Sequence, residues 1–88
     1  KILDKSNGWV TAVIEGRWVQ AKVYDEGSEY GINGGRVSKL AICKTAQRNG
    51  TRPFFAQMDY SYDRGLDFDT LEAGLLNKIV AQLETLPA

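Results

Sequence analysis

One glycine-bearing stretch, residues 24–40, contains the residue types that can bind a small ligand. It reads Y-D-E-G-S-E-Y-G-I-N-G-G-R-V-S-K-L, with four glycines within nine residues. Glycine lets the backbone approach a ligand closely, and successive backbone N–H groups can hold an anion such as a phosphate. An aromatic ring can stack on a base, and an arginine offers a cation in a fixed fork. The sequence therefore predicts a nucleotide-like ligand whose contacts are Tyr30, Asn33, Gly34, Gly35 and Arg36.

A plain connection between two strands is the alternative interpretation of this loop. Asn33, Gly34 and Gly35 favour a tight turn without any ligand. Neither the dinucleotide pattern G-x-G-x-x-G nor the phosphate-loop pattern G-x-x-x-x-G-K-[ST] occurs in the stretch. Asp25 and Glu26, at the entrance of the loop, repel a bare phosphate. The sequence leaves both interpretations open.

The composition argues against the commonest catalytic and metal-binding chemistries. The chain contains no histidine, so it lacks the usual general base and the commonest metal ligand. Cys43 is the single cysteine, and with no histidine to activate it the thiol is expected to be structural. The acidic residues do not match the fixed ligand spacing of an EF-hand loop. We therefore expect a non-enzymatic protein with no metal and no cofactor.

A second class of function, nucleic-acid binding, rests on a basic and aromatic stretch. Lys44, Arg48 and Arg52 precede the neighbouring pair Phe54 and Phe55. Aromatic rings stack on bases, and flanking cations follow the phosphate backbone of a single strand. However, lysine plus arginine equal aspartate plus glutamate at 11 each, so no global positive field favours a nucleic acid. Nucleic acid is therefore the less expected partner.

Residues 9–14 and 17–24 are rich in valine, tryptophan and isoleucine, and the two residues between them predict a tight hairpin. That register places small apolar side chains on one face and both tryptophans on the other. Because tryptophan and tyrosine are enriched at interaction surfaces, we expect an oligomer interface at Trp9, Trp18 and Tyr24. The alternative is that another segment covers the tryptophans, or that they belong to the core.

The remaining pattern predicts two further strands and one helix. Residues 54–62 alternate apolar and polar side chains, as half-buried strands do, and residues 36–44 predict a strand with an imperfect alternation. Asp69 begins an amphipathic stretch with Glu72 in capping-box spacing. These elements predict a single α+β domain over residues 1–88. In this domain a four-stranded antiparallel meander, with the order ββββα, carries the C-terminal helix on one face.

The run over residues 24–40, preceded by a tryptophan-containing hairpin, resembles small proteins of unknown function encoded by phages and prophages of Gram-positive bacteria. The resemblance covers the first half of the chain and brings no known activity or catalytic residue. It implies a phage-type inhibitor of host defence that sequesters a nucleotide-like signal or blocks a host defence protein. The alternatives are a nucleic-acid-binding accessory protein and a structural or assembly component without a ligand.

Location and assembly are predicted from simpler features. The sequence has no secretion signal and no apolar run long enough to span a membrane, and a single cysteine suits a reducing compartment. We therefore expect a cytoplasmic protein, in the cytosol of a bacterial host, without membrane contact. A chain of 88 residues builds only a modest core, so a homo-oligomer is expected.

Overall fold

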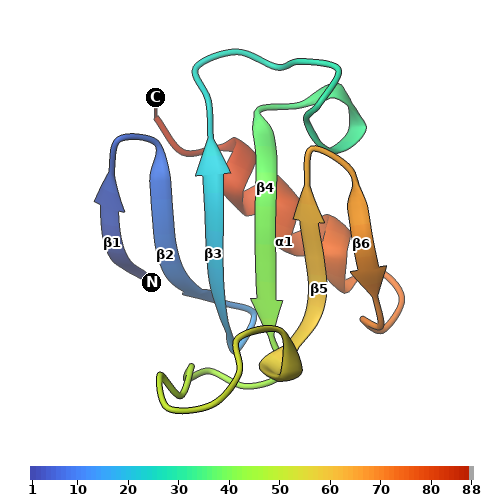
Figure 1. Cartoon of the computed structure of the whole chain (residues 1–88). Coiled ribbons are helices and arrows are strands. Elements are labelled where there is room, and N and C mark those ends of the chain that lie inside the picture. Colours follow the sequence, from blue (N-terminus) through green and yellow to red (C-terminus); the bar gives the residue numbers. More distant parts are fainter. Residues whose placement is uncertain (88) are drawn as a thin grey trace.

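The computed structural model describes residues 1–87, which form a six-stranded antiparallel sheet with one helix on one face (Figure 1). The elements are β1 Ile2–Ser6, β2 Trp9–Ile14, β3 Arg17–Val23, the 3-10 turn η1 Ile32–Gly34, β4 Val37–Cys43, the 3-10 turn η2 Phe55–Gln57, β5 Met58–Asp63, β6 Leu66–Asp69 and the helix α1 Leu75–Glu84. The strands follow one another across the sheet in chain order. The predicted α+β meander and its C-terminal helix are confirmed, but the predicted number of strands, four, is wrong.

The hairpin of β2 and β3 has the predicted register, in which Ile14 pairs with Arg17. Both turn residues have positive φ, 52° at Glu15 and 74° at Gly16. Two-residue turns of this kind match the twist of the flanking strands. The apolar face predicted from this register is buried throughout and consists of Val10, Ala12, Ile14, Val19, Ala21 and Val23.

The two edge strands are the elements that the four-strand prediction lacked. Every residue of β1 is exposed, so its sequence has no alternation of buried and exposed positions to detect. The other edge strand, β6, is only four residues long, and Arg64 forms the turn before it with a φ of 57°. Edge strands need only one neighbour and little burial, which explains why their sequences resemble those of a linker.

The predicted third and fourth strands shift at their ends. The third was expected over residues 36–44 and is observed as β4, from Val37 to Cys43. The fourth was expected from Phe54, but β5 begins at Met58 because Phe54 has helical backbone angles and η2 follows it. Phe54 is therefore part of the connection between β4 and β5, which folds over the sheet.

The helix begins at Leu75 rather than at Asp69. Asp69 pairs with Tyr60 in the sheet, and its carboxylate accepts a hydrogen bond from the Leu71 N–H at 2.9 Å instead of capping a helix. Gly74, expected inside the helix, has a φ of 83° and lies just before it. This left-handed conformation suits glycine, so Gly74 directs the chain into the helix without weakening its interior.

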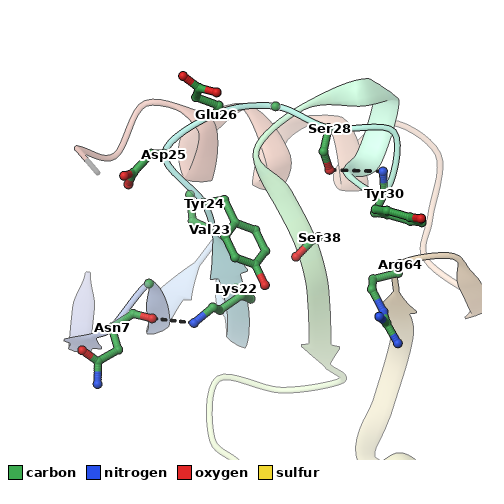
Figure 2. A pocket seen from close by; sticks show the side chains of 12 residues that line it. Asn7, Lys22, Val23, Tyr24, Asp25, Glu26, Ser28, Tyr30, Ser38 and Arg64 are labelled. Carbon is green, nitrogen blue, oxygen red and sulfur yellow. Dashed lines mark hydrogen bonds between the residues drawn. The ribbon is translucent and has the colours of Figure 1, made fainter.

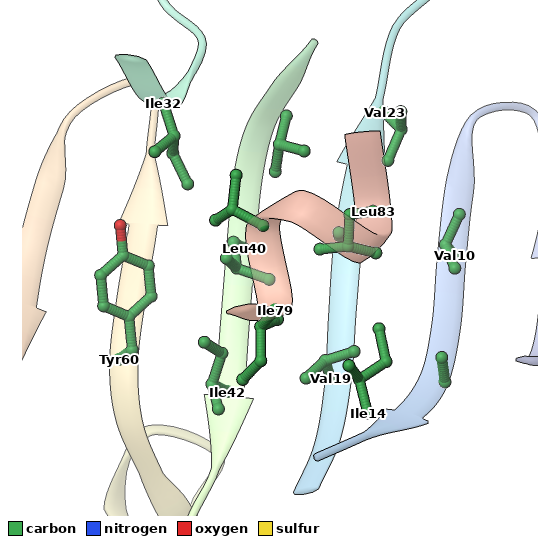
Figure 3. Packing of buried hydrophobic residues seen from close by; sticks show 14 of the residues in the cluster. Val10, Ile14, Val19, Val23, Ile32, Leu40, Ile42, Tyr60, Ile79 and Leu83 are labelled. Atoms are coloured by element: carbon green, nitrogen blue, oxygen red, sulfur yellow. The ribbon is translucent and has the colours of Figure 1, made fainter. Parts of the chain in front are cut away.

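The helix covers one face of the sheet and closes the main core (Figure 3). Leu75, Ile79 and Leu83 are buried, as the predicted apolar stripe requires, and they pack in one cluster with Leu40 and Ile42 of β4. Burying each large aliphatic side chain contributes about 1.5–3 kcal/mol. The apolar face of α1 is thus used within the domain.

A smaller second core lies on the opposite face, which we call the open face of the sheet. Trp18, Cys43 and Met58 are buried there, and the structural role expected for the thiol stays a prediction. The Phe54 ring packs edge-to-face against Trp18, with 6.3 Å between the ring centroids. In Figure 1 the connection from β4 to β5, residues 44–57, lies in front of the lower end of the sheet, on the side away from the helix.

An ion-pair network around Asp59 joins β3 to β5 and includes Lys44, the first residue of this connection. Arg17 Nη1 lies 2.6 Å from Asp59 Oδ2, and Lys44 Nζ lies 2.7 Å from Asp59 Oδ1. Thr70 Oγ1 donates to the same carboxylate at 3.0 Å. Partial burial raises the pKa of Asp59, but the hydrogen bonds from Lys44, Arg17 and Thr70 lower it more, so the pKa of this carboxyl is about 2.

Acid should therefore destabilise the fold through Asp59. A carboxyl group with a lowered folded-state pKa contributes stability above its ordinary pKa of 3.8 and loses it as the pH falls toward 2. Between about pH 6 and about pH 3, we expect the wild type to lose on the order of 1 kcal/mol more free energy of unfolding than Asp59→Asn, measured by urea titration. Parallel pH profiles of the two proteins would contradict this assignment.

Candidate functional site

An open concavity lies at the upper end of the open face, beneath the connection between β3 and β4 (Figure 2). Its volume is about 830 Å³, within the range of small-molecule sites. We call it the Ser38 concavity. Its lining includes Lys22, Tyr24, Glu26, Tyr30, Ser38 and Arg64.

Ser38 lines this concavity and has a buried, unpaired hydroxyl. The residue lies at a β-bulge between Val37 and Lys39, which pair with consecutive residues of β3. Ser38 is only 3% exposed, and its Oγ has no hydrogen-bond partner within residues 1–87. A hydroxyl can donate one hydrogen bond and accept two, and leaving it buried and unpaired costs about 1–3 kcal/mol. A bound polar group would remove that cost.

Two lysines beside Ser38 stand directly opposite each other, Lys22 on β3 and Lys39 on β4. Like charges at such positions destabilise a sheet. Both Nζ atoms lie over the Trp9 ring, at 5.5 and 5.7 Å from its centroid, and Lys39 has the Asp63 carboxylate 3.9 Å away. The aromatic face and the exposed carboxylate offset part of the repulsion. An anion bound between the lysines would offset more, so this row favours an anionic ligand.

Two tyrosine rings flank the Ser38 hydroxyl. Tyr24 is 49% exposed and Tyr30 is 52% exposed, so both offer ring surface to a ligand. Figure 2 shows Ser38 between Tyr24 on one side and Tyr30 with Arg64 on the other. Aromatic rings of this kind pack against planar groups. The concavity can therefore take a planar ring next to an anionic group.

The rim of the concavity carries negative charge, opposite in sign to the charge of the two lysines. Asp25 and Glu26 line it on the side of the connection that follows β3 (Figure 2). Carboxylates accept hydrogen bonds from hydroxyl and amino groups and repel a bare anion. The site as a whole fits a ligand that combines a planar ring, an anionic group and hydrogen-bond donors.

The backbone cradle predicted for the glycine-bearing loop is already used by the loop itself. Gly31 N–H donates to Ser28 O, Gly34 N–H donates to Gly31 O, and Gly35 N–H donates to Ile32 O, each at 3.0 Å. These amides are therefore not free to bind a phosphate. Their hydrogen bonds fold the loop into a compact turn around η1.

Close backbone packing explains two of the loop glycines. A Cβ added at Gly31 would lie 1.8 Å from the carbonyl oxygen of Gly35, and a Cβ added at Gly27 would lie 2.5 Å from that of Gly34. Side chains cannot approach a backbone atom so closely. Glycine at these positions therefore serves the folding of the loop rather than the approach of a ligand.

Arg36 fastens this loop to the C-terminal end of α1. Its Nε donates to Tyr24 O at 2.8 Å, and its Nη1 donates to Glu84 O at 2.9 Å and to Leu86 O at 2.8 Å. In return, the Glu84 carboxylate accepts a hydrogen bond from the Arg36 N–H at 2.8 Å. The last carbonyls of a helix lack intrahelical donors, and a nearby cation also favours the negative end of the helix dipole. These contacts give Arg36 a structural role, and its predicted contact with a ligand stays a prediction.

The five predicted ligand contacts do not come together in one site. Tyr30 lines the Ser38 concavity. Asn33 and Gly35 line a separate cavity of about 290 Å³ against α1. Gly34 is exposed within η1, and Arg36 is engaged with the helix end. The loop therefore contributes one side chain of the predicted set to the larger concavity.

Lys22, Ser38 and Arg64 are among the lining side chains that were absent from the predicted contacts. Lys22 had a usable signal, because the hairpin register places it on the same face as Tyr24. Ser38 and Arg64 had none, because the first depends on a bulge between strands and the second on the turn between β5 and β6.

The predicted interface residues have different surroundings. Trp18 is 8% exposed and packs in the second core, with the Arg48 guanidinium 5.6 Å from its ring centroid. A neighbouring segment thus covers Trp18, as the alternative interpretation allowed, and the ring is not available to a partner. Trp9 is 39% exposed and Tyr24 is 49% exposed. An oligomer interface at these two residues stays a prediction.

The fold and the site define a small α+β meander domain with a ligand-sized concavity on the sheet face that the helix leaves open. Residues 8–84 match the family described as Domain of unknown function (DUF7678), and the chain belongs to this family. No curated protein and no solved structure matches the chain. The description of the family assigns no function, so function is inferred from the site.

Within residues 1–87, no group of three or more histidine, cysteine, aspartate or glutamate side chains is placed to hold a metal ion. The same part of the chain contains no helix of the length and hydropathy needed to cross a membrane.

Replacing Arg36 should destabilise the fold. Arg36→Ala removes three hydrogen bonds from the guanidinium to backbone carbonyls, and we expect a loss of about 2 kcal/mol in the free energy of unfolding, measured by urea denaturation. The control is Arg52→Ala, which changes an exposed arginine and should stay within about 0.5 kcal/mol of the wild type. Equal stability of both variants would show that the Arg36 contacts do not hold the loop.

Proposed function

We propose that this protein is a non-enzymatic binding protein that holds a nucleotide-like small molecule in the Ser38 concavity. The observation that carries the proposal is the buried, unpaired Ser38 hydroxyl beside the opposed Lys22 and Lys39. A phosphate oxygen would accept a hydrogen bond from the hydroxyl and offset the repulsion between the two ammonium groups. One ligand group would then reduce both the cost of the unpaired hydroxyl and the repulsion between the two lysines.

The walls and rim support a nucleotide over inorganic phosphate. The half-exposed Tyr24 and Tyr30 rings offer stacking surface for a base. Asp25 and Glu26 on the rim would accept hydrogen bonds from ribose hydroxyl groups, a role that acidic residues have in dinucleotide sites. Bare phosphate would gain nothing from the rings and would be repelled by the rim.

The chemistry of Ser38 supports binding without catalysis. A serine nucleophile needs an adjacent base that accepts its proton. The Ser38 hydroxyl is not hydrogen-bonded to a base, since no group within residues 1–87 forms a hydrogen bond with its Oγ. We therefore assign Ser38 the role of a hydrogen-bond donor to the ligand.

The sequence also predicted a biological role and an assembly state, and both can be related to the surfaces of this domain. A phage-encoded inhibitor of host defence in the bacterial cytosol would use the concavity to sequester a nucleotide signal. Blocking of a host defence protein, and assembly into a homo-oligomer, would instead use the exposed part of the tryptophan-bearing face at Trp9 and Tyr24.

Calorimetric titration with a panel of purine and pyrimidine nucleoside monophosphates and triphosphates tests the proposal. We expect at least one of these nucleotides to bind, and Lys22→Ala to weaken that complex roughly tenfold, because a charge-assisted contact is lost. Lys78→Ala, which changes an exposed lysine of α1, is the matched control and should bind like the wild type. The proposal is wrong if no nucleotide of the panel binds or if the two variants behave alike.

A pair of serine variants separates binding from stability. Ser38→Ala removes an unpaired hydroxyl, so the free energy of unfolding should stay unchanged or rise, while nucleotide affinity falls several-fold. Ser61 is comparably buried, at 5% exposure, but its Oγ donates to Asp67 at 3.0 Å. Ser61→Ala should therefore lower the free energy of unfolding by about 1 kcal/mol and leave affinity unchanged. Full nucleotide affinity in Ser38→Ala would sink the proposed site.

A further inference from the structure

A second exposed surface lies at the other end of the open face, on the connection from β4 to β5 (Figure 1). We call it the Phe55 surface. It comprises Lys44, Arg48, Arg52, Phe54 and Phe55. This surface is separate from the Ser38 concavity, whose lining shares no residue with it.

Phe55 presents an aromatic ring in a held position. The residue is 61% exposed, the largest exposed fraction among the large apolar side chains of residues 1–87. Its ring is edge-to-face with Phe54, at 5.2 Å between centroids, and with Phe68, at 6.4 Å. These contacts fix the position of the ring, while most of its surface stays in water. Such exposure of a large aromatic side chain is costly and is typical of a binding surface.

Lys44 pairs with Asp59, but the other two cations on this connection have no ion-pair partner within residues 1–87. Residues 44–57 contain three cations and no acidic residue, whereas the whole chain has 11 cations and 11 acids. Arg48 and Arg52 form no ion pair within residues 1–87, and the Arg48 guanidinium lies 5.0 Å from the Phe54 ring centroid. Both arginines are exposed on the same connection as Phe55 and have no ion-pair partner in the described part of the domain.

The loop that carries these arginines is ordered by its own hydrogen bonds. The Gln57 side chain accepts from Asn49 N–H at 2.7 Å and donates to the carbonyls of Asn49, Arg52 and Pro53 at 2.8, 3.2 and 3.2 Å. The Asn49 side chain also accepts from the Thr51 N–H at 2.9 Å. A surface held in this way loses little conformational entropy when a partner binds.

We infer that the Phe55 surface binds single-stranded nucleic acid. A base would stack on the Phe55 ring, and the neighbouring phosphates would lie against Arg48 and Arg52, the combination by which single strands are held without base-edge readout. Positive charge selects a polyanion, and the exposed ring selects one with planar groups to stack. A purely acidic peptide would use the arginines and leave the ring in water.

Fluorescence anisotropy with a short labelled oligothymidylate tests the inference. We expect binding at low salt, with a slope of log affinity against log salt of about −1.4 for two phosphate contacts on a single strand. Phe55→Ala should weaken binding roughly tenfold through lost stacking. The double variant Arg48→Gln, Arg52→Gln should bring the slope close to zero, because both phosphate contacts are removed.

The controls are Lys78→Gln on the helix and Tyr24→Ala in the Ser38 concavity, and both should bind the oligothymidylate like the wild type. An oligoglutamate peptide of similar charge should compete poorly and should not respond to Phe55→Ala. The inference is overturned if the wild type does not bind at low salt, if Phe55→Ala binds unchanged, if oligoglutamate binds equally well, or if Tyr24→Ala causes the larger loss. Because the two surfaces share no residue, nucleotide binding at Ser38 can fail while this test succeeds, and the reverse also holds.

Discussion

One short helix has to cover a six-stranded sheet, and most features of the domain depend on this constraint. The helix, ten residues long, closes the core on one face through Ile79 and Leu83, which are fully buried. Within residues 1–87, no second α-helix covers the other face. The connection from β4 to β5 folds over its lower end and buries Trp18 with Cys43 and Met58. The upper end stays open, and the Ser38 concavity lies there.

A glycine-rich loop can suggest a ligand site, but the polar groups of this loop form hydrogen bonds within the loop and with the helix. Its amides at Gly31, Gly34 and Gly35 donate to carbonyls of the same loop, and Arg36 donates to the carbonyls at the end of α1. The loop lies above the Ser38 concavity, and its Tyr30 side chain lines that concavity (Figure 2). The unpaired hydroxyl group of Ser38 lies below the loop, at the bulge of β4.

The neutral net charge of the chain hides an uneven distribution over the folded surface. Lys22 and Lys39 face each other at the upper end of the open face, and Arg48 and Arg52 lie near its lower end. Each pair is accompanied by exposed aromatic surface, from Trp9 with the two tyrosines in one case and from Phe55 in the other. The two surfaces therefore share one chemical preference, for anions that carry planar groups, although they differ in shape.

By itself, the sequence determined the elements that depend on local pattern. The β2–β3 register and the amphipathic pattern of the C-terminal helix were correct, because side-chain periods of two and 3.6 residues and a two-residue turn act between near neighbours. Only the tertiary structure decided that Arg36 serves the helix end, that Ser38 is left unpaired at a bulge, and that Trp18 is covered. Each of these outcomes depends on a partner far along the chain, 48 positions away for Arg36 and Glu84. A charged or hydroxyl side chain carries no local signal of which distant group will satisfy it.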